Sequence, residues 1–236
     1  MSTTKGLSYS PSGETEEGQN PVSNIKAEPR QNPISTIKAE LRAAMNGVAS
    51  RTIRESGMGY RLVFGVELPR LREIAADYQS DGTPEGNTRA RRLALALWME
   101  DIRECKLLAI LLYPAADFDR DMADLWLEDL RPEQAEVAQL LSMQLLCRMP
   151  QAADQAFLLM ADERPLRQLC GFLSLTRLLM QGSQLSPDAE AEFLDQAAAT
   201  LPTDYLPLRK AVANALLHYG QTSHEAGRKA EHILCN

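Results

Sequence analysis

Lysine and arginine side chains gather at several points of the chain, and the chemistry they share is the binding of phosphate groups. Such cations neutralise the phosphates of nucleic acids and release the counterions around them. The same clusters also occur as solvated helix surfaces without a ligand, and the sequence leaves both interpretations open. Aromatic residues do not alternate with these cations, so stacking of single-stranded bases is not indicated. The clusters are Arg51 with Arg54, Arg89 with Arg91 and Arg92, and Arg209 with Lys210.

Histidine and cysteine residues do not form a metal-binding or nucleophilic pattern. The histidines, His218, His224 and His232, stand near the end of the sequence, and the last two are eight positions apart. Two metal ligands on one helix face need a spacing of three or four. The four cysteines form no CxxC pair, which indicates reduced thiols, mostly packed as small apolar residues. We therefore expect no metal and no cofactor.

The charge of the chain argues against nucleic-acid binding through bulk electrostatics. The formal charge is -7, from 32 acidic and 25 basic side chains. The excess is concentrated between residues 115 and 165, where 11 acidic residues stand against 4 basic ones, and the rest of the chain is balanced. A local basic surface stays possible, and a protein partner is the alternative to DNA.

Residues 1–31 predict a disordered tail, because they are rich in Ser, Gly, Pro, Glu and Asn and poor in large apolar side chains. Segment 19–30 recurs as 31–42, and Pro29 of the first copy stands where the second has Leu41. Since proline interrupts a helix, we expect the first helix in the second copy. The longest apolar run, 107–116, contains a proline and is too short to span a membrane. No export signal is recognisable, so we expect a cytoplasmic protein.

From residue 68 onward the pattern is helical almost throughout, which predicts an all-α fold. Apolar residues recur at helical spacing behind caps or N1 prolines, as at Ser186 and Pro187. Segments 50–66 and 80–87 are expected as loops, because glycine and polar residues interrupt the pattern. Longer apolar helices begin about every 30–40 residues, as in solenoids of paired antiparallel helices. We expect a HEAT-like α-solenoid domain over residues 32–236. Its expected helices include 69–78, 88–99, 101–113, 119–130, 132–148, 152–161, 165–181, 187–201, 205–219 and 223–234.

Two segments resemble a known family. The first, 64–75, reads FGVELPRLREIA, and the second runs from Leu97 and Trp98 through RECKLLAILL at 103–112. Both are similar to the N-terminal part of the AlkD-like DNA alkylation repair proteins, and the resemblance covers about 60–219. It implies a HEAT-like solenoid that binds double-stranded DNA. The active members of that family are DNA glycosylases that excise positively charged alkylated purines.

The resemblance also implies where catalytic residues would stand. Active members carry a Trp-x-x-x-Asp element at the head of the helix that here begins near Pro132, then an arginine and a late tryptophan. The carboxylate stabilises positive charge on the deoxyribose while the glycosidic bond breaks. These positions hold Arg131, Ala135, Arg167 or Gln168, and Asn214 in this chain. The nearest substitutes are Glu136, and Asp129 with Trp126 on the preceding helix.

The sequence therefore predicts a DNA-alkylation-repair-like HEAT-repeat protein that has lost the glycosylase residues. We expect a monomeric, non-catalytic module that binds DNA or a protein. The alternative is an active glycosylase with a displaced carboxylate. By resemblance, the candidate DNA contacts are Arg89, Arg92, Arg131, Arg167, Arg209 and Lys210.

Overall fold

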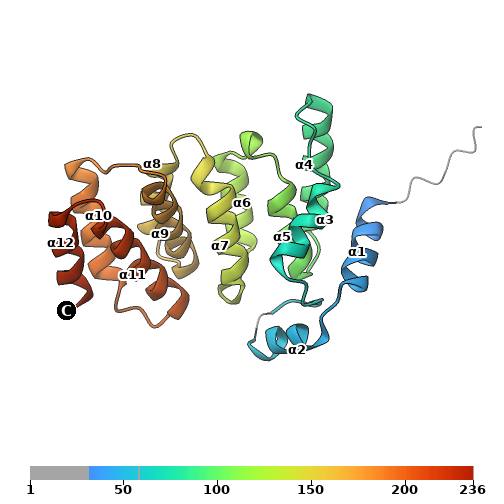
Figure 1. The fold of residues 1–236 in the computed structure, drawn as a ribbon, viewed down its shortest axis with the longest axis horizontal. Helices are drawn as coiled ribbons and strands as arrows, with labels where there is room; N and C mark the ends of the chain where they lie inside the picture. The colour runs from blue at the N-terminus through green and yellow to red at the C-terminus, as the bar shows by residue number, and fades with distance from the viewer. Residues whose placement is uncertain (1–31, 58, 236) are drawn as a thin grey trace, which may run out of the picture. The chain divides into compact units, whose positions relative to one another are not determined.

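The computed structural model describes residues 32–57 and 59–235, and this part of the chain is built from helices joined by turns (Figure 1). The predicted tail, 1–31, lies outside the described residues. No strand forms in the described part, where Leu62 and Ile102 make an isolated bridge, so the predicted all-α class is confirmed. No helix in this part is long and apolar enough to cross a membrane. The α-helices are α1 (Pro33–Ala43), α2 (Gly47–Glu55), α3 (Leu68–Ala76), α4 (Pro84–Trp98), α5 (Arg103–Leu112), α6 (Arg120–Asp129), α7 (Ala135–Gln144), α8 (Ala152–Met160), α9 (Pro165–Met180), α10 (Pro187–Thr200), α11 (Leu206–Gly220) and α12 (His224–Leu234).

The helices pack around one continuous row. Helices α3, α5, α7, α9 and α11 follow one another, each packed against the next, and we call them the α3–α11 row. A second helix covers several members of the row: α4 packs on α5, α8 on α9, and α12 on α11. In a solenoid each helix pair buries its apolar surface against the neighbouring pairs. The predicted arrangement of paired helices therefore matches the packing.

Helix α2 was not expected from the sequence, and helix α4 begins earlier than expected. The Asn46 side chain accepts a hydrogen bond from the N–H of Ala49 and starts α2, which extends through Glu55 into the segment expected as a loop from residue 50. The Thr83 hydroxyl accepts from the N–H of Gly86 and starts α4 within the expected loop 80–87. The loop prediction is wrong for 50–55 and 84–87, because at both places a polar N-cap starts the helix without the large buried apolar side chains on which the prediction depended. Of the residues of α2, Ser50 alone is buried.

The helix expected over 132–148 is divided into three pieces. A 3₁₀ turn spans Pro132–Gln134, α7 follows it, and a second 3₁₀ turn spans Leu146–Arg148. The Gln134 side chain accepts from the backbone N–H of Arg131 over 3.1 Å and closes the first turn. Leu145 has a helical ψ of -57° but a φ of -117°, well beyond the usual helical value, and it separates α7 from the second turn. Glu136 therefore lies in the first turn of a short helix.

An aromatic core joins α6 to α4. The rings of Trp98 and Trp126 stack with centroids 4.0 Å apart and planes 6° from parallel. Tyr113 and Phe118 meet the Trp126 ring at 5.4 Å, each with its plane steeply inclined to that ring. Such aromatic contacts contribute stability beyond the burial of their area. Trp126 is fully buried, so this catalytic candidate is a core residue.

Candidate functional site

Two adjoining cavities lie along the α3–α11 row, and Glu136 and Gln139 of α7 line both. The α3–α9 cavity, of about 480 Å³, is lined by α3, α5, α7 and α9. The α9–α11 cavity, of about 510 Å³, is lined by α7, α9 and α11. We call the two together the α7 cavities. Of the three catalytic candidates, Glu136 lines these cavities, whereas Trp126 and Asp129 line neither.

The carboxylate of Glu136 is held by Arg103 of α5. Arg103 Nε donates to Glu136 Oε2 over 2.7 Å, and Nη2 donates to Oε1 over 2.5 Å, so the pair is bidentate. The Arg103 side chain is 7% exposed and that of Glu136 is 38% exposed. Burial disfavours the charge on Arg103, but hydrogen bonds and charges from Glu136 and Glu104 outweigh it and raise the pKa of the guanidinium. Both oxygens of Glu136 are thus engaged by a fixed cation.

Arg103 is itself fixed by Glu104 and by the segment that precedes α3. Arg103 Nη1 donates to Glu104 Oε1 over 2.9 Å and to the Val66 carbonyl over 3.1 Å. The fully buried Glu104 carboxylate accepts from the backbone N–H groups of residues 64–66, over 2.9 to 3.3 Å. Gly65 has φ +75°, and a Cβ there would meet backbone atoms of the α2 start at 2.5 Å. The two segments that carry the family resemblance therefore meet at the base of the Arg103–Glu136 pair.

A half-buried tyrosine lies beside this pair. The hydroxyl of Tyr60 is enclosed and has no hydrogen-bond partner among the described residues. Burial is the main cause that raises its pKa, and the charge of Glu136 adds to it, while Arg103 and Arg131 act in the opposite direction. Tyr60 therefore stays a neutral phenol at ordinary pH and adds no charge to the site.

Cations outnumber anions in the lining of the α7 cavities. Arg72 and Arg177 line the α3–α9 cavity and Lys210 lines the α9–α11 cavity, whereas Glu136 is their one acidic residue. In the described part of the chain, neither Arg72 nor Lys210 forms an ion pair, and the Nε of Arg177 is buried without a hydrogen-bond partner. Arg209 is exposed next to Lys210. Because the ion pair balances Glu136, the lining favours anionic ligands.

The other predicted carboxylate, Asp129, is also engaged. Its Oδ2 accepts from Lys106 Nζ over 2.5 Å, and Lys106 lies 4.3 Å from the centroid of the Trp98 ring. This ring stacks on Trp126 in the aromatic core. The contacts of Asp129 and Trp126 are therefore those of a packed junction between helices.

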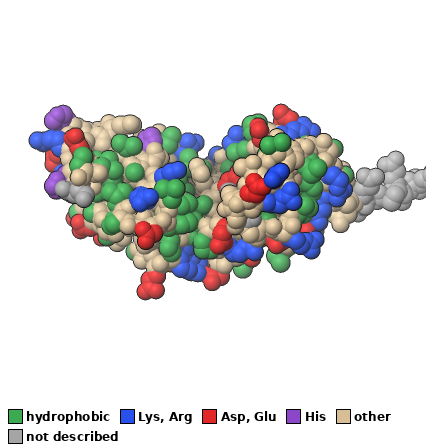
Figure 2. All heavy atoms as spheres, turned by 90° about the horizontal axis from the view of Figure 1, so that it is seen from below, with side chains coloured by type: hydrophobic (Ala, Val, Ile, Leu, Met, Phe, Trp, Pro, Cys, Tyr) green, Lys and Arg blue, Asp and Glu red, His purple; other side chains and the backbone are tan. Residues whose placement is uncertain are grey.

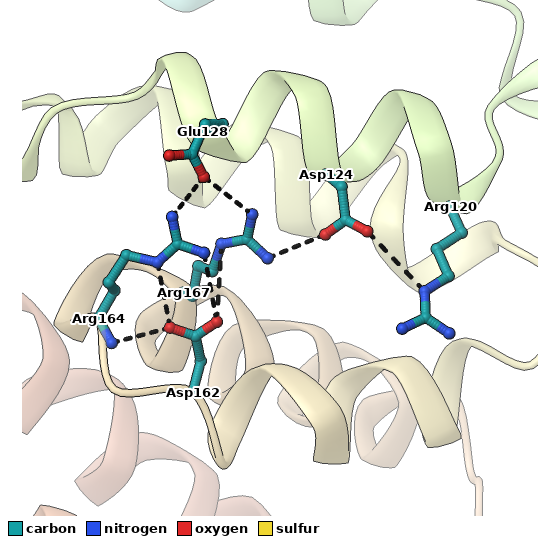
Figure 3. A network of polar contacts seen from close by, with 6 residues as sticks. All are labelled: Arg120, Asp124, Glu128, Asp162, Arg164 and Arg167. Atoms are coloured by element: carbon teal, nitrogen blue, oxygen red, sulfur yellow. Dashed lines mark hydrogen bonds and ion pairs between the residues drawn. The ribbon is translucent and has the colours of Figure 1, made fainter.

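Arg167 is surrounded by carboxylates (Figure 3). Its Nη1 donates to Asp124 over 2.9 Å and its Nη2 to Glu128 over 3.4 Å, and the side chain is 11% exposed. Arg164 bonds Glu128 and Asp162 in the same network, which joins α6 to the turn between α8 and α9. Three acidic residues of the acidic segment 115–165 are thus neutralised here and do not line the α7 cavities.

The remaining predicted DNA contacts lie at separate places. Arg131 donates to Asp101 over 3.0 Å. Arg89 and Arg92 line a third cavity, of about 740 Å³, formed by α1, α4 and the end of α3. Figure 2 shows cationic and anionic side chains interspersed over the face in view. Of the six predicted contacts, only Lys210 lines the α7 cavities.

The histidines and cysteines take no part in a metal site within residues 32–57 and 59–235, where no group of His, Cys, Asp and Glu could hold an ion. The histidines belong to α11 and α12. Cys105, Cys147 and Cys170 are buried and Cys235 is exposed. Burial raises the pKa of each buried thiol, to about 12 for Cys105 and for Cys170. These buried thiols therefore stay protonated at neutral pH.

Sequence reasoning did not identify Arg72, Arg103 or Arg177 as site residues. Arg103 had a usable signal, because an adjacent Arg-Glu pair at the head of an apolar helix must find buried partners. Arg72 and Arg177 had none. Their cavity is formed by helices that are far apart in the sequence, and each arginine alone is typical of an exposed helix face.

The comparisons with known proteins agree with this architecture. Residues 37–230 match the family model described as DNA alkylation repair enzyme. No curated protein matches the chain. One solved structure that matches is described as a new family of proteins related to the HEAT-like repeat DNA glycosylases with affinity for branched DNA structures. It superposes with a TM-score of 0.68 at 18% identity, covering 84% of this chain and 80% of that chain. The likeness confirms the predicted HEAT-like fold.

Proposed function

Because the chain belongs to the DNA alkylation repair enzyme family, we propose that it binds duplex DNA along the α3–α11 row and does not excise bases. In this proposal Lys210, Arg209, Arg72 and Arg177 contact the phosphate backbone. The similar solved protein has affinity for branched DNA structures, so our proposal includes branched duplexes among the ligands.

The observation that supports a non-catalytic role is the bidentate pair between Arg103 and Glu136. Cleavage of a glycosidic bond builds positive charge on the sugar, and a carboxylate stabilises that charge best when no other cation already neutralises it. Releasing Glu136 would leave Arg103 buried with one carboxylate fewer. Asp129 also forms an ion pair, through one oxygen, with Lys106. Neither candidate is therefore a free carboxylate.

The distribution of charge supports DNA over a protein partner. Part of the acidic excess that argued against phosphate binding is neutralised by ion pairs with Arg164 and Arg167 in the network of Figure 3. The α7 cavities instead present Arg72, Arg177 and Lys210. Arg131 and Arg167 stay predicted DNA contacts, although at each a phosphate would have to displace a carboxylate. Arg89 and Arg92 would contact DNA only where it reaches α4.

The alternative is an active glycosylase in which Glu136 serves as the displaced carboxylate. One observation favours it: Glu136 lines both α7 cavities and its side chain is 38% exposed. A base-excision assay on duplex DNA carrying a methylated, positively charged purine separates the two proposals. We expect no release of the base. Release that disappears in Glu136→Gln would establish the glycosylase.

DNA binding is tested by measuring the affinity for paired and branched duplexes at increasing salt. We expect affinity to fall as salt rises, because counterions are released on binding. Lys210→Glu and Arg89→Glu should each weaken binding. Affinity unchanged by both substitutions would favour a protein partner. A monomeric state, a cytoplasmic location and a domain boundary at residue 32 stay predictions from the sequence.

A further inference from the structure

We propose that the α3–α9 cavity receives one unpaired nucleotide of the bound DNA. Its base would lie against the apolar wall of the cavity, and its flanking phosphate would contact Arg72 and Arg177. This inference rests on the proposed DNA binding and adds to it a preference for DNA in which a nucleotide is free of its partner, as at a bulge or a branch.

The size and walls of the cavity fit a nucleotide. Its volume of about 480 Å³ falls within the range of about 300–1,000 Å³ found for pockets that enclose small ligands. The apolar surface that the cavity exposes comes mainly from the half-buried Leu68 of α3 and Met143 of α7, while Leu107 and Leu140, which also line it, are buried. A nucleobase removed from its stack needs apolar surface against its face, and aliphatic side chains provide it. The cavity is larger than a phosphate ion alone requires.

Two amide side chains in the cavity lining could form hydrogen bonds with the edge of a bound base. Gln139 and Gln144 both line the cavity, and neither side chain forms a hydrogen bond within the described residues. Each amide offers two donor hydrogens and an acceptor oxygen. Such a group can pair with the donor and acceptor edge of any base, so we expect recognition of an unpaired nucleotide with little preference among bases.

The charge of the cavity fits the phosphate of that nucleotide. The buried Nε of Arg177 has no hydrogen-bond partner among residues 32–57 and 59–235, and a buried donor without a partner is unfavourable until an acceptor reaches it. Burial raises the pKa of the Cys147 thiol, and the guanidinium of Arg177, which hydrogen-bonds this thiol, opposes that rise. Among the described residues Arg177 forms no ion pair. Glu136 is the acidic residue of the lining, and Arg103 already balances it.

The adjoining α9–α11 cavity favours a DNA strand over a free nucleotide as the ligand. From Glu136 and Gln139 the lining continues into the α9–α11 cavity and reaches Lys210, beside the exposed Arg209. A free mononucleotide has no second phosphate for these cations, whereas a DNA strand presents phosphates at regular intervals. The two cavities together therefore match an unpaired nucleotide with its neighbouring backbone.

The test compares two duplexes of the same sequence, one fully paired and one with a single unpaired 2-aminopurine. We expect the protein to bind the second about tenfold more tightly, a difference of about 1.4 kcal/mol in binding free energy. The 2-aminopurine fluorescence should change on binding, because its stacking changes. Free 2-aminopurine deoxyribonucleoside monophosphate should bind at least about a hundredfold more weakly than the bulged duplex, because it lacks the other phosphate contacts.

Substitutions assign the preference to the cavity. Arg72→Gln and Arg177→Gln should each reduce the preference for the bulged duplex by about tenfold, the effect of one charge-assisted hydrogen bond. Arg70→Gln is the matched control, because Arg70 lies on the same helix, pairs with Glu73 over 2.6 Å and lines no part of this cavity. It should keep the preference. Arg72 and Arg70 are both exposed, so these two variants should fold alike.

The outcomes separate the inference from the proposed function. Equal affinity of the wild-type protein for the two duplexes would overturn the nucleotide cavity and leave DNA binding standing. Binding to neither duplex would overturn both. A preference that survives Arg72→Gln and Arg177→Gln would also contradict binding of the nucleotide in this cavity. If the free nucleotide bound as tightly as the bulged duplex, the ligand would be a mononucleotide and not a DNA strand.

Discussion

The guanidinium of Arg103 and the carboxylate of Glu136 form a bidentate ion pair, with Nε to Oε2 at 2.7 Å and Nη2 to Oε1 at 2.5 Å. The pair connects α5 and α7. Arg103 also contacts Glu104, whose carboxylate accepts hydrogen bonds from the backbone N–H groups of residues 64–66. One arginine thus connects the segment before α3, the head of α5 and the first turn of α7. The position of Glu136 in the α7 cavities is therefore fixed by Arg103 and by the buried contacts of Arg103 with Glu104.

Removing Arg103 should therefore destabilise the protein more than removing the charge of Glu136. Arg103→Met leaves the fully buried Glu104 without its cation, and breaking a buried pair in this way costs about 3–5 kcal/mol. Glu136→Gln keeps a hydrogen-bond acceptor for Arg103, and the Glu136 side chain is 38% exposed. We therefore expect this variant to lose about 1 kcal/mol of unfolding free energy. Urea denaturation of both variants measures the two losses. Equal losses would contradict a structural role for Arg103 beyond Glu136.

Lys210 should contribute one phosphate contact to DNA binding. Lys210→Gln should lower the affinity for all duplexes alike and reduce the slope of log affinity against log salt by about 1. Lys229→Gln is a matched control, because it removes the same charge from a lysine already paired with Glu190 and Glu225. Fluorescence anisotropy at several salt concentrations measures both slopes. A slope reduced equally by both variants would point to net charge and not to a contact.

The helices could be predicted from the sequence wherever a cap and an apolar period coincide. Ser186, for example, caps α10 ahead of Pro187, as expected. Helix α2 was missed because Ser50 alone of its residues is buried, and because Gly57, Gly59 and Gly65 follow it closely and favoured a loop. The division of the 132–148 helix depends on the backbone of Leu145, for which the sequence offers no signal.

The candidate site was harder to predict, because its contacts join residues distant in the chain. Arg103 and Glu136 are 33 positions apart and meet only because α5 packs on α7. The sequence does indicate Glu136 as the nearest carboxylate to the expected position, but it cannot show which cation faces it. In the same way, the pairing of Arg167 with Asp124 depends on how α6 lies against the head of α9.

The buried thiols predict how the protein responds to alkaline pH. Burial raises the pKa of Cys105 and of Cys170 to about 12, above the value of about 8.5 for a thiol in water. The folded protein therefore keeps these protons where the unfolded chain loses them, and stability should fall as pH rises from about 9 towards 12. At pH 8 a thiol reagent should modify the exposed Cys235 and spare the other three. Rapid modification of Cys105 or Cys170 in the native protein would contradict this burial.

Gly171 should be required for the close approach of α8 and α9. A Cβ at this position would lie 2.6 Å from the Met160 nitrogen and 2.7 Å from the Ala156 carbonyl oxygen. These are backbone atoms of α8, so the helices must separate to admit a methyl group. We expect Gly171→Ala to destabilise the protein by about 1–3 kcal/mol through overpacking, even though alanine favours a helix. Gly47→Ala is the control, because a Cβ there meets nothing within 4 Å. Thermal unfolding of the two variants distinguishes them, and equal melting temperatures would show that α8 and α9 can yield without cost.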